Sequence, residues 1–332
     1  MKKLLAVIAI FLLLFISCDT DFNVNADWEE VTVVFGLLDQ SQDTQYIRIN
    51  KAFLGNQDAY QMASVSDSLN YSREDLEVKI QRVKYSGSDL NVLDEVVLDD
   101  TVMYKDEGVF ASDDNLVYFF KTDNFLVEDK KFLLTITNLS TGQVVSSETN
   151  LIHDLSLMSS FNNPAYKMGF YNQSGDFSAT TIEWTHAQNA AIYEVTMFLN
   201  YTEYGQDTIV KTISKVFPII PYSGSSEMSQ KINGEEFFNF IANAVEGNGN
   251  VNRRVNNIDL LFSAGTTELQ TYINLNQPPT GIVQERPVFT NIDNGIGIFS
   301  SRYNKLQENI SITNTTKEAI SFHLDSLNFI FP

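Results

Sequence analysis

Alternating apolar and polar residues dominate the first half of the chain. Residues 45–50 and 76–83 place Ile or Val on one face and mainly polar side chains on the other. A period of two is that of a β-strand with one buried face. Similar short runs, rich in β-branched and apolar residues, lie at 31–35, 96–98, 116–121, 132–139 and 143–149. About seven or eight strands separated by turns predict an immunoglobulin-like β-sandwich, although the Cys and Trp pattern of antibody domains is lacking.

The second half combines strands with helical periodicity. Strands are predicted at residues 180–185, 192–204, 208–217 and 258–264. Apolar residues recur at helical spacing from Phe237 to Val245, after Asn233 as an N-cap and two carboxylates in the first turn. Thr266 is placed to cap a second helix, and a third is expected within residues 315–327. We therefore expect an α+β domain with an antiparallel sheet and about three short helices.

A turn signal stands near the end of the chain. The Asp-Asn-Gly residues 293–295 separate apolar runs at 288–292 and 296–302. Asn and Gly accept the positive φ angles of tight turns, so this pattern predicts a β-hairpin. Gly297, inside the second run, predicts a bulge or a close approach of another backbone segment.

The first eighteen residues have the pattern of a bacterial export signal. Lys2 and Lys3 precede an unbroken apolar run of thirteen residues, 4–16. This run suits a secretory signal and is too short for a membrane-spanning helix, which needs ~20 residues. Ser17 and Cys18 then resemble a bacterial lipobox, whose Cys is lipidated and becomes the first residue of the mature protein. Cys18 is the predicted lipidation site; an ordinary signal peptide followed by an unmodified Cys is the alternative.

Acidic residues after Cys18 resemble the surface-export signals of Bacteroidota lipoproteins. We therefore expect a cell-envelope lipoprotein of the outer membrane that faces the cell exterior, held by its lipid anchor. The predicted organisation is a signal peptide (1–17), a lipidated Cys with its tether (18–29), a β-sandwich domain (30–154), a junction (155–178) and the α+β domain (179–332).

The net charge excludes several classes of partner. The 332 residues include 22 Lys and Arg against 42 Asp and Glu, a formal net charge of −20. A negative protein cannot neutralise nucleic-acid phosphates, so no nucleic-acid partner is expected. For the same reason, the protein as a whole is not attracted to anionic lipid. Cys18 is the only Cys, which excludes a disulfide framework and Cys-rich metal sites.

Motifs for catalysis or cofactor binding are absent from the sequence. His153, His186 and His323 lie far apart, without the spacing of zinc ligands. There is no Gly-x-Ser-x-Gly, phosphate loop or Gly-x-Gly-x-x-Gly. Acidic doublets occur between the predicted strands, where a solvated acidic face is favoured over a calcium site, at residues 94–95, 99–100, 106–107 and 113–114. We predict no catalytic residue, metal or cofactor, while a carboxylate pair for glycoside hydrolysis stays open.

Two further features concern exposed segments. Four Asp-Ser/Thr-aliphatic tripeptides resemble O-glycosylation sites of exported Bacteroidota proteins, with hydroxyl residues Ser68, Thr101, Thr208 and Ser326. The motif is short, and chance would supply one or two matches in a chain with 23 Asp residues. Residues 54–75 form a long insertion between two predicted strands, and such loops are usually functional or mobile.

Several stretches together resemble a family of Bacteroidota lipoproteins known only as a domain of unknown function. They are GLLD at 36–39, QYIRINKAF at 45–53, NIDLLFSAG at 257–265, GIVQERP at 281–287 and TNIDNGIGIFSSR at 290–302. Members are often encoded beside TonB-dependent outer-membrane receptors. The resemblance therefore implies, by association, such a receptor as partner, and it supplies no catalytic residues.

Three functions are compatible with these observations. The first is a non-catalytic binding or accessory subunit associated with an outer-membrane TonB-dependent transporter. The second is an enzyme acting on extracellular glycan or peptide through unrecognised carboxylates, and the third is a passive surface adhesin. We favour the first because no catalytic motif accompanies the predicted lipid anchor.

Overall fold

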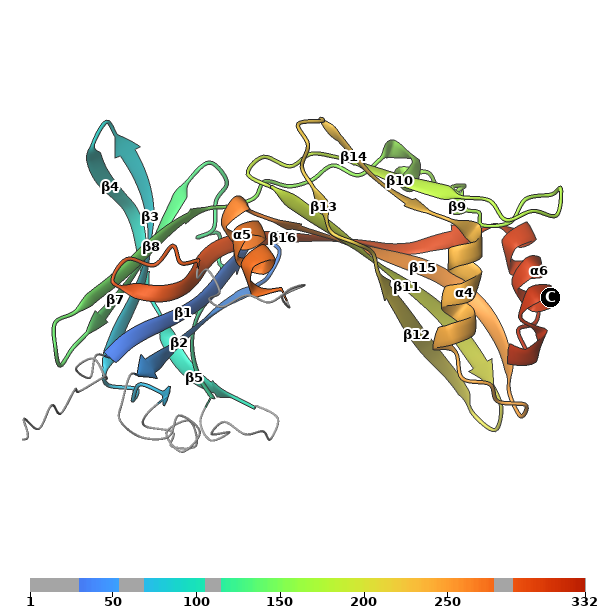
Figure 1. Ribbon diagram of the computed structural model, residues 1–332, viewed down its shortest axis with the longest axis horizontal. Coiled ribbons are helices and arrows are strands. Elements are labelled where there is room, and N and C mark those ends of the chain that lie inside the picture. Colours follow the sequence, from blue (N-terminus) through green and yellow to red (C-terminus); the bar gives the residue numbers. More distant parts are fainter. Residues whose placement is uncertain (1–29, 54–68, 105–114, 278–288, 332) are drawn as a thin grey trace, which may run out of the picture.

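The computed structural model describes residues 30–53, 69–104, 115–277 and 289–331. The predicted signal peptide, Cys18 and tether, most of the 54–75 insertion, and residues 281–287 of the family resemblance lie outside these residues. The described chain is mainly β with antiparallel sheets and three α-helices, which confirms the expected sandwich followed by an α+β unit (Figure 1). No helix among the described residues is long and apolar enough to cross a membrane.

The sandwich unit packs two sheets against each other. Its strands are β1 (Glu30–Asp39), β2 (Thr44–Phe53), β3 (Leu76–Ser86), β4 (Asp89–Val97), β5 (Asp99–Met103), β6 (Asn115–Lys121), β7 (Lys131–Asn138) and β8 (Val144–Asn150). One sheet has the order β4-β3-β7-β8, and β1-β2-β6-β5 belong to the other. Ile47 and Ile49 from one sheet and Val78 and Ile80 from the other are buried in a common core, as their alternation predicts.

The bounds predicted for one strand of this unit are wrong. Residues 96–98 were expected to form a single strand, whereas Val96 and Val97 end β4 and the chain then changes sheets. Leu98 is buried at the crossing, where its backbone N–H donates to the Val78 carbonyl, and β5 begins in the opposite sheet at Asp99. Local alternation does not encode such a change of sheet, because it depends on which partner strand is available.

The α+β unit is built on four long antiparallel strands. They are β11 (Ile192–Tyr204), β12 (Thr208–Val216), β15 (Asn252–Gly265) and β16 (Gly295–Ile312), in the order β12-β11-β15-β16. Short strands surround them: β9 (Lys167–Met168), β13 (Ile220–Pro221), and a separate pair, β10 (Thr180–Thr185) with β14 (Glu227–Ile232). The 3₁₀ turns are η1 (Ser159–Asn162) and η2 (Asp325–Leu327). Within the predicted junction 155–178, Leu155, Met168 and Phe170 are buried in the core of this unit.

The three helices lie where the sequence predicts them. They are α4 (Gly234–Ala244), α5 (Thr267–Asn276) and α6 (Asn314–His323). Thr266 caps α5 by accepting from the Leu269 N–H, as predicted. Asn233 precedes α4 but makes no capping bond with its side chain, and α6 begins one residue earlier than expected, capped by Thr313. The apolar face of α4 packs into the core through Phe237, Phe238 and Ile241.

A single strand joins the two units. The first half of β16 pairs in parallel with β1, with Thr32 opposite Gly295 and Asp39 opposite Arg302. Its second half pairs antiparallel with β15, where Gly265 is also opposite Arg302. The eighteen residues of β16 span about 55 Å at ~3.3 Å per residue. The two units thus share one ten-stranded sheet, with β16 crossing between them in Figure 1.

The parallel pairing corrects the predicted hairpin. Gly295 does begin a strand and Asn294 has the positive φ of a turn residue, 57°. The strand pairs with β1, more than 250 positions earlier in the sequence, and Asp293 forms a bridge with Ser146 instead of opening a hairpin. The expected close approach at Gly297 is confirmed: its φ is +113°, and a Cβ there would overlap the carbonyl oxygen of Val34.

Candidate functional site

A broad surface cavity lies beside α4 in the α+β unit. We call it the α4 groove; it has a volume of about 820 Å³ and lies between α4, the end of β12 and the segment that leads into β10. Among the residues that line it are Phe177, Ser214, Lys215, Glu236, Asn239, Phe240 and Asn243. Its size is within the ~300–1,000 Å³ range of small-molecule sites in proteins.

The chemistry of the α4 groove suits a polar ligand. Asn239 and Asn243 are exposed on α4 and present amide donors and acceptors. Phe177 and Phe240 add partly exposed aromatic surface. Lys215 Nζ lies 2.9 Å from Glu236 Oε1, so the charge of this lysine is already neutralised. The groove therefore offers hydrogen bonds and apolar contact, and the exposed Glu235 adds a negative charge to its lining.

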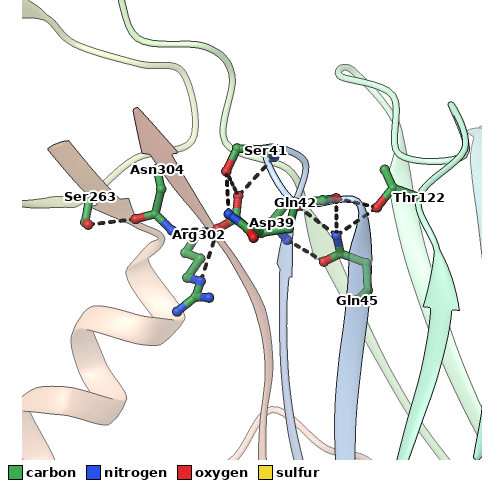
Figure 2. A network of polar contacts seen from close by, with 8 residues as sticks. All are labelled: Asp39, Ser41, Gln42, Gln45, Thr122, Ser263, Arg302 and Asn304. Atoms are coloured by element: carbon green, nitrogen blue, oxygen red, sulfur yellow. Dashed lines mark hydrogen bonds and ion pairs between the residues drawn. The ribbon is translucent and has the colours of Figure 1, made fainter. Parts of the chain in front are cut away.

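A second polar cluster lies where the two units meet, around Asp39 (Figure 2). Asp39 ends β1 and is 1 % exposed. Its carboxylate accepts hydrogen bonds from the backbone N–H and hydroxyl of Ser41, from Asn304 Nδ2 at 2.6 Å and from Arg302 Nε at 3.2 Å. Its backbone N–H donates to Gln45 Oε1 at 2.8 Å, and its carbonyl oxygen accepts from Gln45 Nε2.

The Asp39 cluster reaches strands of both units. Gln45 Nε2 also donates to Thr122 Oγ1, at the end of β6. On the other side, Ser263 of β15 donates to Asn304 Oδ1 at 2.7 Å. The cluster in Figure 2 therefore ties the sandwich sheet to β15 of the α+β unit. Because every oxygen of the Asp39 carboxylate is engaged by fixed donors, this cluster is suited to holding the units together.

A neighbouring cluster surrounds Asp154 on the same junction. Asp154 Oδ1 accepts from Tyr303 Oη at 2.8 Å and from Lys305 Nζ at 2.7 Å, both on β16. Burial, and then the hydrogen bond to Asp154, raise the pKa of Tyr303, so its hydroxyl stays protonated as a donor. Lys305 Nζ also donates to the carbonyl of Leu155. The second half of β16 is thereby fixed to the segment that leaves the sandwich.

The predicted modification sites fall in different environments. Cys18 and Ser68 lie outside the described residues. Thr101 is half-buried on β5 opposite Val117, whereas Thr208 at the start of β12 and Ser326 in η2 are exposed. The structure does not bring these hydroxyl groups together, and O-glycosylation and lipidation stay predictions.

The His and acidic residues considered as metal ligands have local partners. His153 lies 3.6 Å from a Glu128 oxygen, and His186 stacks on Tyr222 with a ring-centroid distance of 3.5 Å. His323 packs edge-on against Tyr171. In the doublets, Asp94 pairs with Arg82 and Asp100 with Arg73, while residues 106–107 and 113–114 lie outside the described chain. No group of three His, Cys, Asp or Glu suited to a metal occurs among the residues that the structure describes.

Sequence reasoning missed the buried polar groups. Besides Asp39, it missed Arg253, which is 2 % exposed, binds Glu203 at 2.8 Å and donates to the carbonyls of Leu327 and Glu246. An available signal was a charged residue within an otherwise apolar strand pattern. Asp39 follows the apolar run of β1, and Arg253 occupies an inward position of β15.

No family model matches this chain, and no curated protein matches it. The resemblance to Bacteroidota lipoproteins therefore stays a prediction.

Proposed function

We propose that this chain is a lipid-anchored outer-membrane lipoprotein that acts as a non-catalytic binding or accessory subunit of a TonB-dependent transporter. The export signal, the lipobox-like Cys18 and the family resemblance support the anchor and the partner. The α4 groove is the proposed ligand-facing surface, because its volume is that of a small-molecule site and it combines amides with aromatic rings.

The single observation that carries this proposal is the course of β16. The described chain begins at Glu30, and β1 runs from there in parallel with β16 toward the junction at Asp39. The strand β16 then continues into the unit that contains the α4 groove. The proposed tether, residues 18–29, therefore joins the end of the sandwich that is remote from the groove, as Figure 1 shows for β1 and α4.

This arrangement suits a subunit anchored at one end that binds at the other. A continuous hydrogen-bonded strand across both units resists bending more than a flexible linker would, since bending requires ladder bonds to break. In an anchored chain of this shape the groove lies away from the anchored end, where a large partner can reach it.

The test compares the native chain with Cys18→Ala in the producing cell. We expect wild type to incorporate labelled fatty acid, to lose residues 1–17 by intact mass, and to co-purify with a β-barrel protein from detergent-solubilised outer membranes. Cys18→Ala should keep its leader, take up no label and recover no partner, at equal expression.

Two results would contradict the proposal separately. An uncut leader or a free thiol at Cys18 in the wild type would remove the anchor. A lipidated wild type that repeatedly purifies without a β-barrel protein would retain the anchor and remove the transporter. Ser17→Ala serves as the matched control, because it keeps a small residue before Cys18.

A further inference from the structure

A pocket with a positive rim lies at the far end of the α+β unit. Its walls are the start of β15, the first turns of α6 and the C-terminal residues 329–331, and its volume is about 270 Å³. Hydrogen bonds between Arg253 and the backbone of Asn328 and Ile330 hold the C-terminal segment against β15. We call this cavity the basic pocket; its volume is just below the range of common small-molecule sites, ~300–1,000 Å³.

Three cations gather at this place. Arg254 and Lys317 line the basic pocket, and Lys167 stands close by on β9, opposite Ser311. Lys317 is half-buried, and burial, followed by the charges of Arg254 and Lys167, lowers its pKa. Arg254 and Lys167 therefore both lie near enough to Lys317 to disfavour its positive charge.

These cations differ from half of the Lys and Arg residues that the structure describes. Nine Lys and Arg residues in the described ranges form ion pairs with Asp or Glu. Within those same ranges, neither Lys167 nor Arg254 has an ion-pair partner, and Lys317 donates only to the carbonyl of Asn256 at 3.4 Å. In a chain with a net charge of −20, carboxylates are abundant, so a concentration of unneutralised positive charge requires a reason other than composition.

Asn314 adds a polar side chain to the lining, and the other lining residues are apolar. Val255, Ile320 and Phe329 are buried behind the surface, whereas Ile330 is exposed and Phe331 is half-buried. A cationic rim over apolar walls is complementary to an anion attached to an apolar body. The guanidinium of Arg254 presents paired donors that match a phosphate or carboxylate, and Lys317 adds a second positive charge.

We propose that the basic pocket binds a small organic anion, with its phosphate or carboxylate group between Arg254 and Lys317 and its apolar body against Ile330 and Phe331. This site is separate from the α4 groove, and it depends on neither the lipid anchor nor the transporter.

The test uses the full chain in a neutral detergent and isothermal titration with four probes. Phenyl phosphate and benzoate carry both the anion and the apolar ring, inorganic phosphate carries only the anion, and phenol only the ring. We expect saturable binding of phenyl phosphate or benzoate, weaker binding of inorganic phosphate, and none of phenol. Binding should weaken as salt rises, because the rim is partly exposed.

Matched variants locate the site. Arg254→Gln and Lys317→Gln should each weaken binding of phenyl phosphate about tenfold, the effect of losing one charge-assisted contact. Lys84→Gln, which removes an exposed lysine of β3 in the sandwich unit, should leave the affinity unchanged. Comparing phenyl phosphate with benzoate then shows which anion the site prefers.

A stability measurement separates ligand binding from a structural role. Without ligand, Lys317→Gln should raise the urea midpoint, because it removes a half-buried charge that its neighbours repel. Saturating phenyl phosphate should stabilise the wild type more than the variant, because the variant binds about tenfold more weakly. The proposal is overturned if neither organic anion binds saturably, if both variants bind as the wild type does, or if phenol binds as tightly as phenyl phosphate.

Discussion

Asn304 donates to the buried carboxylate of Asp39 over 2.6 Å, although 265 positions separate the two residues in the sequence. Asp39 belongs to the sandwich strand β1, and Asn304 to the half of β16 that pairs with β15. Their hydrogen bond joins the two units two residues beyond Arg302, where β16 changes from a parallel to an antiparallel partner. The first prediction follows from this contact.

Asp39→Ala should lower the free energy of unfolding by about 3 kcal/mol, because several donors lose their acceptor inside the protein. Arg302→Ala should cost less than ~1 kcal/mol, since the Arg302 side chain is 49 % exposed and its ion pair is solvated. Urea denaturation of both variants measures the difference. Equal losses would show that the buried carboxylate is not the centre of the junction.

Gly297→Ala tests the parallel pairing of β1 with β16. The new Cβ would overlap the Val34 carbonyl oxygen, so we expect a loss of ~4 kcal/mol or more, or failure to yield soluble protein. Gly142→Ala is the matched control: this glycine also has a positive φ, +73°, but no atom lies near its Cβ position. It should cost only ~1–2 kcal/mol. If the two variants unfold at the same urea concentration, the close approach is wrong.

The buried pair of Glu203 and Arg253 predicts a defined pH dependence. Hydrogen bonding from Lys211, and then from Arg253, outweighs burial and keeps the pKa of Glu203 below its ordinary value of 4.5. A lowered pKa in the folded state stabilises the fold above pH 4.5, and this contribution is lost as the pH falls through the folded-state value.

Glu203→Gln should therefore destabilise the protein by ~3–5 kcal/mol at neutral pH, because Arg253 keeps a buried charge without its carboxylate. The gap between the wild type and this variant should narrow as the pH falls below 4.5. Urea midpoints at a series of pH values give the result. Arg73→Gln, at an exposed ion pair, should cost less than ~1 kcal/mol. A gap independent of pH would exclude an ionised Glu203.

Accessibility ranks the predicted O-glycosylation sites. Thr208 and Ser326 are exposed, whereas Thr101 is half-buried within a strand pair. We expect peptides from the native host to carry a mass shift at Thr208 and Ser326 and none at Thr101. Thr208→Val and Ser326→Ala should remove the respective shifts. Unmodified Thr208 and Ser326 would show that the tripeptides arise by chance.

Local periodicity predicted most elements of the fold. The alternation over residues 192–204 has the same bounds as β11, and the helical spacing after Asn233 became α4. These signals are reliable because they report which face of one segment is buried, a property of neighbouring residues. The Thr266 cap succeeded for the same reason, since donor and acceptor are three residues apart.

The sequence did not predict which strands and side chains pair with each other. The turn residues before Gly295 suggested a hairpin with the preceding segment. No residue near them indicates that the strand pairs with β1 instead. The same holds for the crossing at Leu98, for Asp39 with Asn304, and for Arg254 with Lys317 across the basic pocket. Each pair joins residues whose separation along the chain carries no periodic signal.

From the order of residues alone came the strands, the helices, the large negative charge and the prediction of a lipid-bearing Cys18. Only the tertiary structure shows that β16 pairs with strands of both units and that Asp39 is buried where they meet. It alone also shows where the α4 groove and the basic pocket lie. The physical reason is the distance along the chain over which each effect acts. Backbone geometry and alternating burial act over a few residues, whereas strand pairing and charge clustering depend on distances that exist only after the chain has folded.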